Sequence, residues 1–414
     1  MKTLVLTVAL LCLSKCIAGP LTPTIRLHAK RGSTLQLGDI INEFALDMSE
    51  VLWREPGNVA FSPLSIASLM SLVMSGSSGT TYTQLRNALL YSASTPDIMI
   101  HSNYRNVLQS LARLNNDVTV NVATRLFLAS GANILSNFTR LAQEHYGSSV
   151  RVLSFRDDPF GSMEAVNQWV RSETNGKIPQ LITHPFDAQT SFVATNTVYF
   201  KGAWEHPFDP QQTQDGIFNT GSSNITVPMM RSIMTVPFVE MRELNAEMIA
   251  LPYKGYEYGM LLIRPNGPVD DSTLQEVEFG LDAPTLNRYI GEMTNSTRIV
   301  TLPRMRLNFK TYLKNALTSL NVVDMFNPSS ADFSRLTANK QVWVDNVIHQ
   351  TVVEVNESGT EAAASTSISF NRIGTSRTFE VNRPSIFIIR HMRTGVPLFW
   401  GRIMSPDPLE TSGF

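Results

Sequence analysis

The amino-terminal part of the chain carries two apolar patterns that are typical of helices. From Ile40 to Trp53, apolar residues recur every three to four positions, which predicts a helix with one buried face that Pro56-Gly57 ends. Ser62-Pro63 is suited to open a second helix, because serine caps helices and proline fits their first turn. The run from Leu64 to Met74 is apolar nearly all round. We therefore expect this helix to be buried on every side.

A third helix is predicted from Ser162 to Thr174, with Asn175-Gly176 ending it. Most of the remaining chain consists of runs that predict strands: Val118 to Ala129, Phe192 to Tyr199, Glu247 to Leu251, Met260 to Ile263, Arg298 to Pro303, Thr351 to Val355 and Ile386 to Arg390. Helices that come first and strands that follow in mixed order predict an α+β fold. No fixed repeat or long linker divides the chain, so we expect one domain.

The segment after Val355 combines two patterns that seldom occur together. Residues 357–367 have almost only small side chains, which predicts an exposed loop. From Thr360 to Asn371, however, alternate positions give one face that is small and then apolar and another that is polar, as in a half-buried strand. A loop that is patterned to become a strand is what a loop-insertion mechanism requires. A surface linker that happens to alternate is the alternative interpretation.

The first residues resemble a targeting segment. Lys2, a short apolar run and the small residues near Ala18 predict a signal peptide at 1–18, a mature domain at 19–414 and secretion. Both cysteines, Cys12 and Cys16, lie in that segment, so the mature chain would have neither disulfides nor thiol-based metal sites or catalysis. The four sequons that could accept glycans in a secreted protein are Asn137, Asn224, Asn295 and Asn356.

Composition and charge exclude several classes of function. The chain has 34 basic and 35 acidic residues, which gives no general case for nucleic acid or anionic membranes as partners. The sequence contains no nucleophile elbow of the G-x-S-x-G type, no H-E-x-x-H motif and no Walker loop, so we expect neither an enzyme nor a metal or other cofactor.

Several spaced motifs resemble the serpin family, the serine-protease inhibitors, over nearly the whole mature chain. The residues that carry the resemblance are Asn58-Val-Ala-Phe-Ser-Pro-Leu-Ser-Ile-Ala, Val166-Asn-Gln-Trp-Val, Asn175-Gly-Lys-Ile, Asn196-Thr-Val-Tyr-Phe-Lys-Gly-Ala-Trp, Val227-Pro-Met-Met, Glu357-Ser-Gly-Thr-Glu-Ala-Ala-Ala, Asn382-Arg-Pro-Ser-Ile-Phe and Pro397-Leu-Phe-Trp-Gly-Arg. The resemblance implies a fold of three β-sheets with about eight or nine helices and an exposed reactive loop at about 357–381.

The resemblance also implies roles for single residues. An inhibitory-type hinge would consist of Glu357, Gly359, Thr360, Glu361, Ala362, Ala363 and Ala364, with Thr360 the first to insert. A polar cluster beneath the point where two strands part would contain Ser62, Ser65, Asn196 and His349, and Trp204 would lie at the top of the sheet, where insertion begins. From residue type alone, the polar residues could equally be hydrogen-bonded core groups and Trp204 an ordinary buried tryptophan.

The resemblance implies that the chain traps a target serine protease as a covalent acyl complex. Members that do not inhibit often have bulky or charged residues at the inward hinge positions, whereas this hinge has Thr360, Ala362 and Ala364 there. The reactive bond would be Ile373-Gly374; a loop shorter by one residue would give Arg372-Ile373, and Arg377 is a third candidate. An apolar residue suits an elastase-like or chymotrypsin-like protease and arginine a trypsin-like one. The alternative is a serpin-fold carrier, storage or hormone-precursor protein that does not inhibit.

Two further expectations concern partners. Members that bind heparin carry basic clusters on one helix, whereas residues 82–116 offer only Arg86, Arg105 and Arg113. We interpret these arginines as part of a solvated helix face and expect no heparin-like partner. We also expect a monomer.

Overall fold

The computed structural model describes residues 36–112, 117–338, 341–358 and 377–407. Its α-helices within these ranges are α1 (Leu37–Val51), α2 (Pro63–Gly76), α3 (Gly79–Ala88), α4 (Asp97–Ala112), α5 (Ser136–Tyr146), α6 (Pro159–Glu173), α7 (Asp271–Gly280), α8 (Ala283–Glu292) and α9 (Lys314–Ser319). The first two confirm the helices expected from apolar spacing. The nine α-helices within the described ranges agree with the eight or nine helices that the family resemblance implies.

Local chemistry explains where the expected helices begin and end. Ser62 caps α2 by accepting a hydrogen bond from the Ser65 amide, Pro63 takes the first turn, and nearly every residue of the helix is buried. Helix α6 begins before the expected Ser162, because the Asp158 carboxylate caps it by accepting from the Gly161 amide at 2.8 Å. It ends as expected: Asn175 and Gly176 follow with φ of 49° and 75°, in the left-handed region.

One sheet has five strands in the order β10-β11-β4-β2-β3. Their bounds are β2 (Val118–Ala129), β3 (Ser149–Leu153), β4 (Phe192–Gly202), β10 (Met305–Tyr312) and β11 (Val344–Val355). Strand β11 lies parallel to β4 and antiparallel to β10, and β4 lies antiparallel to β2. The two central strands of this sheet are therefore parallel neighbours that have no third strand between them.

The other sheet of the described residues has nine strands. They are β1 (Val59–Phe61), β5 (Gln214–Asn219), β6 (Asn224–Met241), β7 (Ala246–Pro252), β8 (Tyr258–Pro265), β9 (Thr294–Pro303), β12 (Arg377–Glu380), β13 (Ser385–His391) and β14 (Pro397–Ile403). The expected third sheet is not separate in these ranges, because the 18 residues of β6 pair with β5 and β9 along most of their length and with β7 at their end. One long strand thus joins what would otherwise be two sheets.

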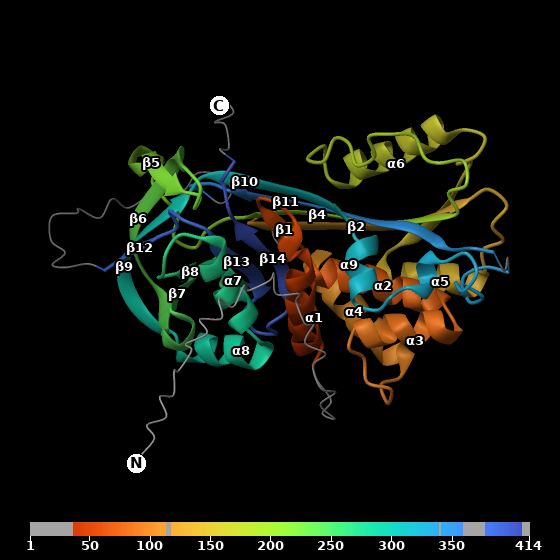
Figure 1. Ribbon diagram of the computed structural model, residues 1–414, viewed down its shortest axis with the longest axis horizontal. Helices are drawn as coiled ribbons and strands as arrows, with labels where there is room; N and C mark the ends of the chain where they lie inside the picture. The colour runs from red at the N-terminus through yellow and green to blue at the C-terminus, as the bar shows by residue number, and fades with distance from the viewer. Residues whose placement is uncertain (1–35, 113–116, 339–340, 359–376, 408–414) are drawn as a thin grey trace, which may run out of the picture.

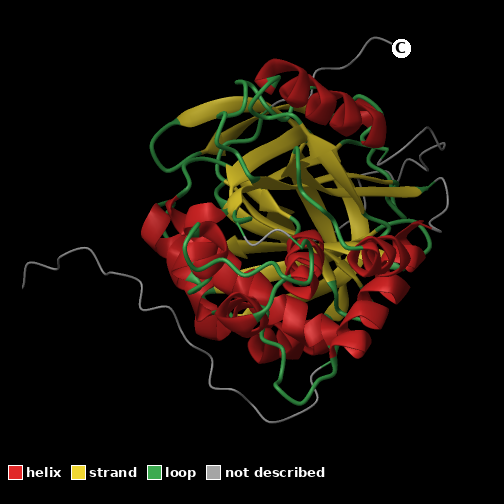
Figure 2. Cartoon of the chain, turned by 90° about the vertical axis from the view of Figure 1, so that its right-hand side faces the viewer, coloured by secondary structure: helices red, strands yellow, loops and turns green. Residues whose placement is uncertain are grey.

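The five-stranded sheet is covered on both faces. Helix α6 lies on one face, and α2 with its neighbouring helices lies on the other (Figures 1 and 2). Beneath α6, the apolar core contains Phe127, Val193, Tyr199, Ile348 and Val352 from the strands together with Val166, Trp169 and Val170 from the helix. The alternate residues of the same strands join the main core with α2. Any strand added to this sheet would therefore be buried on both faces.

Candidate functional site: the seam between two parallel strands

The candidate site is the line along which β4 and β11 pair, which we call the seam. Its register runs from Val344 opposite Phe192 to Val353 opposite Phe200. Strand β11 ends at Val355, at what we call the upper end of the seam, and the strand-like alternation begins five residues later in the sequence, at Thr360. A chain that turned back there would run antiparallel to β11. It would also be antiparallel to β4, because β4 and β11 run in the same direction.

The polar cluster implied by the resemblance is assembled across the middle of the seam. Asn196 and His349 are directly opposite each other in the register, and His349 Nδ1 lies 2.8 Å from Asn196 Oδ1. The Ser65 hydroxyl donates to the same Asn196 oxygen at 2.7 Å and lies near the Ser62 carbonyl at 3.1 Å. The Ser62 amide donates to His349 Nε2 at 3.1 Å. All four residues are buried, and the start of α2 is thereby tied to both strands.

The hydrogen bonds fix the protonation of His349. Because the Ser62 amide is a donor, Nε2 must be the acceptor, and the ring proton is on Nδ1, where Asn196 Oδ1 accepts it. The ring is fully buried, and this desolvation lowers the pKa of His349 to about 3, although its contact with Asn196 acts in the opposite direction. A neutral imidazole therefore belongs to the closed seam. A protonated one would direct an N–H at the Ser62 amide.

The upper end of the seam is fixed to a second group of residues. The Trp204 indole donates to the Asn356 carbonyl at 2.8 Å and stacks on Tyr253 with ring centroids 4.5 Å apart. The Phe208 amide donates to the Glu357 carbonyl at 2.9 Å. Trp204 is buried, so it is a core tryptophan that also binds the first residues after β11.

The Glu357 side chain adds a buried ion pair at the same place. Its Oε1 accepts from the Thr213 hydroxyl at 2.7 Å and from Arg304 Nη1 at 3.1 Å. Both partners are largely removed from water, with side-chain exposures of 20% for Arg304 and 8% for Glu357. Glu357 is thus held by two connections that are far apart in the sequence, one before β5 and one between β9 and β10. The sequence motif singled out Glu357 but gave no indication of either partner.

The segment after α6 is fastened both to the helix and to the upper part of β11. Asn167 of α6 donates to the Ile182 carbonyl at 2.8 Å and accepts from the Leu181 and Ile182 amides at 2.9 and 2.8 Å. Lys177 forms an ion pair of 3.3 Å with Glu354 of β11. The helix and the residues after it are therefore fastened over the strands that would have to separate.

The lower end of the seam contains a residue that the sequence analysis missed. Asp345 of β11 accepts hydrogen bonds from the Ser191 amide at 2.6 Å and the Phe192 amide at 2.9 Å, at the start of β4. The Trp343 indole donates to its other oxygen at 3.1 Å. A single carboxylate in an otherwise β-type run gave no motif, and only the pairing of the two strands brings these groups together.

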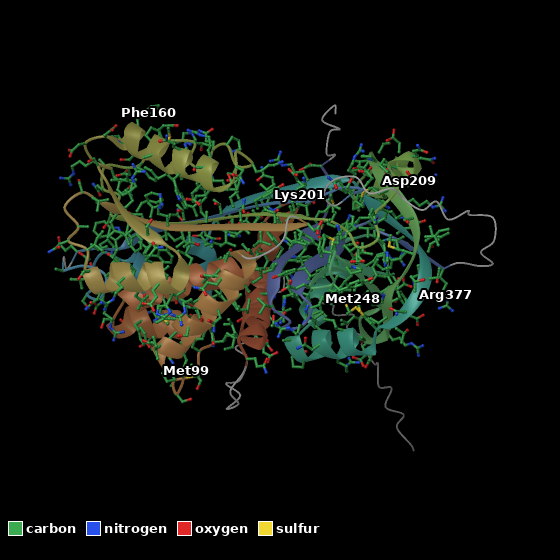
Figure 3. All side chains as sticks on the ribbon, turned by 180° about the vertical axis from the view of Figure 1, so that it is seen from behind. Met99, Phe160, Lys201, Asp209, Met248 and Arg377 are labelled. Atoms are coloured by element: carbon green, nitrogen blue, oxygen red, sulfur yellow. The ribbon has the colours of Figure 1, made fainter. Side chains whose placement is uncertain are left out.

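Part of the expected site lies outside the described residues: Gly359, Thr360, Glu361, Ala362, Ala363, Ala364, Arg372, Ile373 and Gly374. Arg377, the third candidate for the reactive bond, is the first residue of β12 and pairs with Arg298 of β9 (Figure 3). Its side chain is 73% exposed and lies 3.7 Å from Glu240. A residue that belongs to a sheet strand fits a protease cleft poorly, because the cleft needs a free extended segment.

The sequons differ in exposure. Asn137, Asn224 and Asn295 are exposed, whereas Asn356 is half-buried and its carbonyl is bonded to Trp204. Their use as glycan acceptors stays a prediction.

The expected solvated helix face is wrong for Arg86. This guanidinium is buried, pairs with Asp97 at 2.7 Å, and donates to the Tyr82 hydroxyl at 2.8 Å and to the Ser92 carbonyl. Arg105 pairs with Glu144 at 3.1 Å, and Arg113 lies outside the described residues. Arg86 therefore acts as a structural cation.

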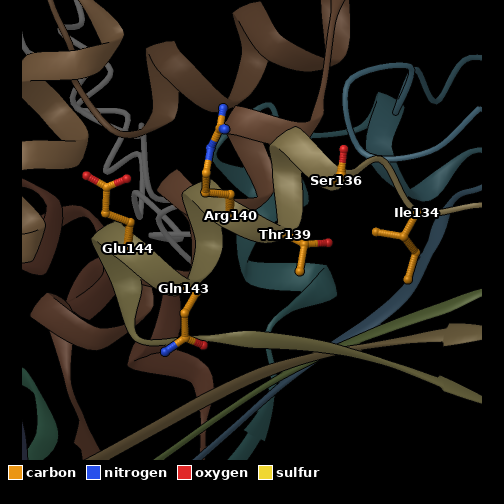
Figure 4. Close-up of a pocket in the computed structure, with 6 residues that line it drawn as sticks. All are labelled: Ile134, Ser136, Thr139, Arg140, Gln143 and Glu144. Atoms are coloured by element: carbon orange, nitrogen blue, oxygen red, sulfur yellow. The ribbon is translucent and has the colours of Figure 1, made fainter.

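Other surface features in the described part of the chain do not belong to the seam. An open hollow beside α5 is lined by Ile134, Ser136, Thr139, Arg140, Gln143 and Glu144 (Figure 4). Within the described ranges, no group of three or more His, Cys, Asp or Glu side chains is placed to hold a metal ion. Among the same residues, no helix combines the length and apolarity needed to cross a membrane.

The fold and the seam define the class of protein, and comparisons with known proteins identify it. Residues 39–406 match the family described as Serpin (serine protease inhibitor), and the chain belongs to this family. It is similar to leukocyte elastase inhibitor A of Rattus norvegicus, with 32% identity over 380 residues that cover 90% of this chain and all of that one. The crystal structure of uncleaved ovalbumin superposes with a TM-score of 0.83 at 26% identity, covering 90% of this chain and 100% of ovalbumin.

One comparison corrects the expected location. Intracellular coagulation inhibitor 1 of Tachypleus tridentatus is 31% identical over 401 residues, which cover 95% of this chain and 94% of the relative. The name of this relative contradicts the prediction of a secreted, extracellular protein. Residues 1–18, on which that prediction depended, lie outside the described residues.

Proposed function

We propose that this chain inhibits serine endopeptidases as a suicide substrate, by cleavage of its loop and insertion of that loop between β4 and β11. The observation that carries the proposal is the parallel pairing of these strands, next to a segment whose alternation fits a half-buried strand. An inserted strand would be antiparallel to both neighbours. Every ladder position lost when the seam opens would then be replaced on both sides by a new one.

The reaction would use the protease's own chemistry. The protease serine attacks the carbonyl carbon of Ile373, its histidine takes the serine proton and delivers it to the Gly374 nitrogen, and the peptide bond breaks. Ile373 remains attached to the protease as an ester. Insertion would then carry the ester-linked protease away from the start of the loop before water can hydrolyse the bond.

The side chains of the hinge favour insertion over mere cleavage. Thr360, Ala362 and Ala364 alternate on the face that would turn inward, and none of them is bulky or charged. Small inward groups let a strand enter a packed sheet without displacing its neighbours. This feature supports an inhibitor over a carrier or storage protein with the same fold. A relative named leukocyte elastase inhibitor also supports an apolar residue, Ile373, before the bond.

The proposal is tested by incubating the protein with elastase, chymotrypsin and trypsin in separate reactions. We expect an adduct that survives SDS with at least one protease, and mass spectrometry of the released fragment identifies the bond. A fragment that begins at Gly374 supports Ile373-Gly374, and one that begins at Ile373 supports Arg372-Ile373. Cutting by all three proteases without any adduct would overturn the proposal.

A pair of loop variants tests the insertion step. Thr360→Arg should turn the inhibitor into a substrate, because the sheet would have to bury a charge. Glu361→Arg is the matched control, since its side chain belongs to the polar face of the same loop. Equal inhibition by the two variants would contradict insertion.

A further inference from the structure

The lower end of the seam is closed by a side chain in place of a regular ladder. The pairing of β11 with β4 shifts register between Val344 and Asn346, so Asp345 has no partner residue in β4. A bulge of this kind leaves the extra residue unpaired and redirects its side chain. The Asp345 carboxylate consequently reaches the Ser191 and Phe192 amides, at 2.6 and 2.9 Å.

The two sides of β4 differ at this point. On the β2 side, the Ser191 carbonyl accepts from the Ala129 amide at 2.9 Å, which is an ordinary main-chain bond. On the β11 side, the acceptor for two successive amides is the charged carboxylate of Asp345. Hydrogen bonds to an ionised acceptor are shorter and stronger than neutral ones. The start of β4 is therefore held to β11 more firmly than a single ladder bond would hold it.

We infer that Asp345 is a positioning residue that keeps the lower end of the seam closed and sets the barrier for the last part of loop insertion. This inference rests on the proposed function. An inserted strand would give the Ser191 and Phe192 amides main-chain acceptors of their own, but only after both amides have left Asp345. The barrier arises because the old bonds must break before the new ones can form.

The length of β11 limits the effect to one end of the seam. Strand β11 has 12 residues, from Val344 to Val355. A strand that begins at Thr360 opposite Val355 and runs antiparallel to β11 reaches Asp345 only at roughly residue 370. The first half of insertion therefore leaves Asp345 undisturbed. The last few residues cannot enter without displacing its bonds.

Two synthetic peptides of different length separate these stages. One has the sequence of residues 360–371 and fills the seam, and the other has the sequence of residues 360–365 and fills only its upper half. Each is labelled with a fluorophore and incubated with the full-length protein, and the rate of association is followed by fluorescence anisotropy. The proteins compared are the unaltered chain, Asp345→Ala, Asp345→Asn and Asp187→Asn.

The expected result is specific to the long peptide. Asp345→Ala should accelerate its association about tenfold, and Asp345→Asn should accelerate it less, because the uncharged amide oxygen can still accept both bonds, although more weakly than the carboxylate does. The short peptide should associate with all proteins at the same rate. Asp187→Asn should match the unaltered chain, because Asp187 bonds the Gln189 amide within its own turn.

Other outcomes would overturn the inference. If the long peptide enters Asp345→Asn and Asp345→Ala no faster than the unaltered chain, Asp345 does not hold the seam. If both peptides are accelerated equally, the substitution loosens the whole sheet and Asp345 has no positional role. Asp345→Asn carries the test if Asp345→Ala does not fold. If neither peptide enters the unaltered chain, the proposed function fails and the inference with it.

Discussion

The buried side chain of His349 resists protonation while the seam is closed. Its pKa is lowered to about 3 by burial, against an ordinary value of 6.5. The unfolded chain therefore binds more protons than the folded one between these two values. Stability is complete above pH 6.5 and falls as the pH drops toward 3, by about 2 kcal/mol at pH 5 from this residue alone.

The prediction is checked with His349→Gln, whose side chain does not titrate in this range. We expect the loss in free energy of unfolding between pH 7 and pH 5, measured with denaturant, to be smaller in the variant by about 2 kcal/mol. Burial also lowers the pKa of His101, to about 4, but His101 is present in both proteins and cancels in the difference. Identical pH profiles would contradict the assignment of a buried neutral His349.

Arg304 and Glu357 allow a second prediction at this scale. Arg304→Met removes the cation and leaves the Glu357 side chain, which is 8% exposed, with the Thr213 hydroxyl as its hydrogen-bond donor. We expect the free energy of unfolding to fall by about 3 kcal/mol. The double variant Arg304→Met with Glu357→Gln removes both charges and should recover most of this loss. If the double variant is as unstable as Arg304→Met, the unpaired Glu357 charge is not the cause of the lost stability.

At the scale of elements, α6 must remain attached to the sheet while the seam is closed. Asn167 makes three hydrogen bonds to the main chain of Leu181 and Ile182. Asn167→Ala would leave the buried Leu181 and Ile182 amides without their acceptor, and we expect a loss of about 3 kcal/mol in local stability. Hydrogen exchange of the Leu181 and Ile182 amides should become faster. Gln168→Ala, at the neighbouring exposed position of the same helix, should leave the exchange unchanged.

The sequence predicted strands best where buried and exposed positions alternate or where apolar runs are unbroken. Val118 to Ala129 was predicted with the bounds that β2 has. For β11, only Thr351 to Val355 was predicted, whereas the strand begins at Val344. The missed half contains Asp345, Asn346, His349 and Gln350, whose polar side chains interrupt the apolar pattern. Gln350, for example, donates to Asn308 of β10 at 2.9 Å, a partner that is distant in the sequence.

Dependence on partners that are distant in the sequence also decides which parts of the candidate site could be predicted. The cluster of Ser62, Ser65, Asn196 and His349 was found through a family resemblance, and its geometry agrees with a hydrogen-bonded group across the seam. Asp345 and Arg304 belong to no such motif. Their importance depends on strand register and on burial, which a single sequence does not contain.

At the scale of the whole molecule, a parallel pair of central strands is the less stable arrangement. An antiparallel strand inserted between β4 and β11 would add ladder bonds on both sides and bury an apolar face against a core already covered by α2 and α6. The closed sheet would then persist because of a barrier and not because it is the most stable state. The contacts of His349, Glu357 and Asp345 lie at the middle, the upper end and the lower end of the seam, and all of them would have to change when a strand enters.

This view makes a prediction about the nicked protein. Cleavage after residue 372 or 373 frees the loop, and the ladder bonds gained over the length of β11 should raise the melting temperature by on the order of 10 °C or more. Calorimetry of the intact and nicked forms measures the difference. The same nick in Thr360→Arg should give a much smaller rise, because the charged residue would have to enter first. A nicked native sequence that melts no higher than the intact protein would mean that the closed sheet stores no conformational energy.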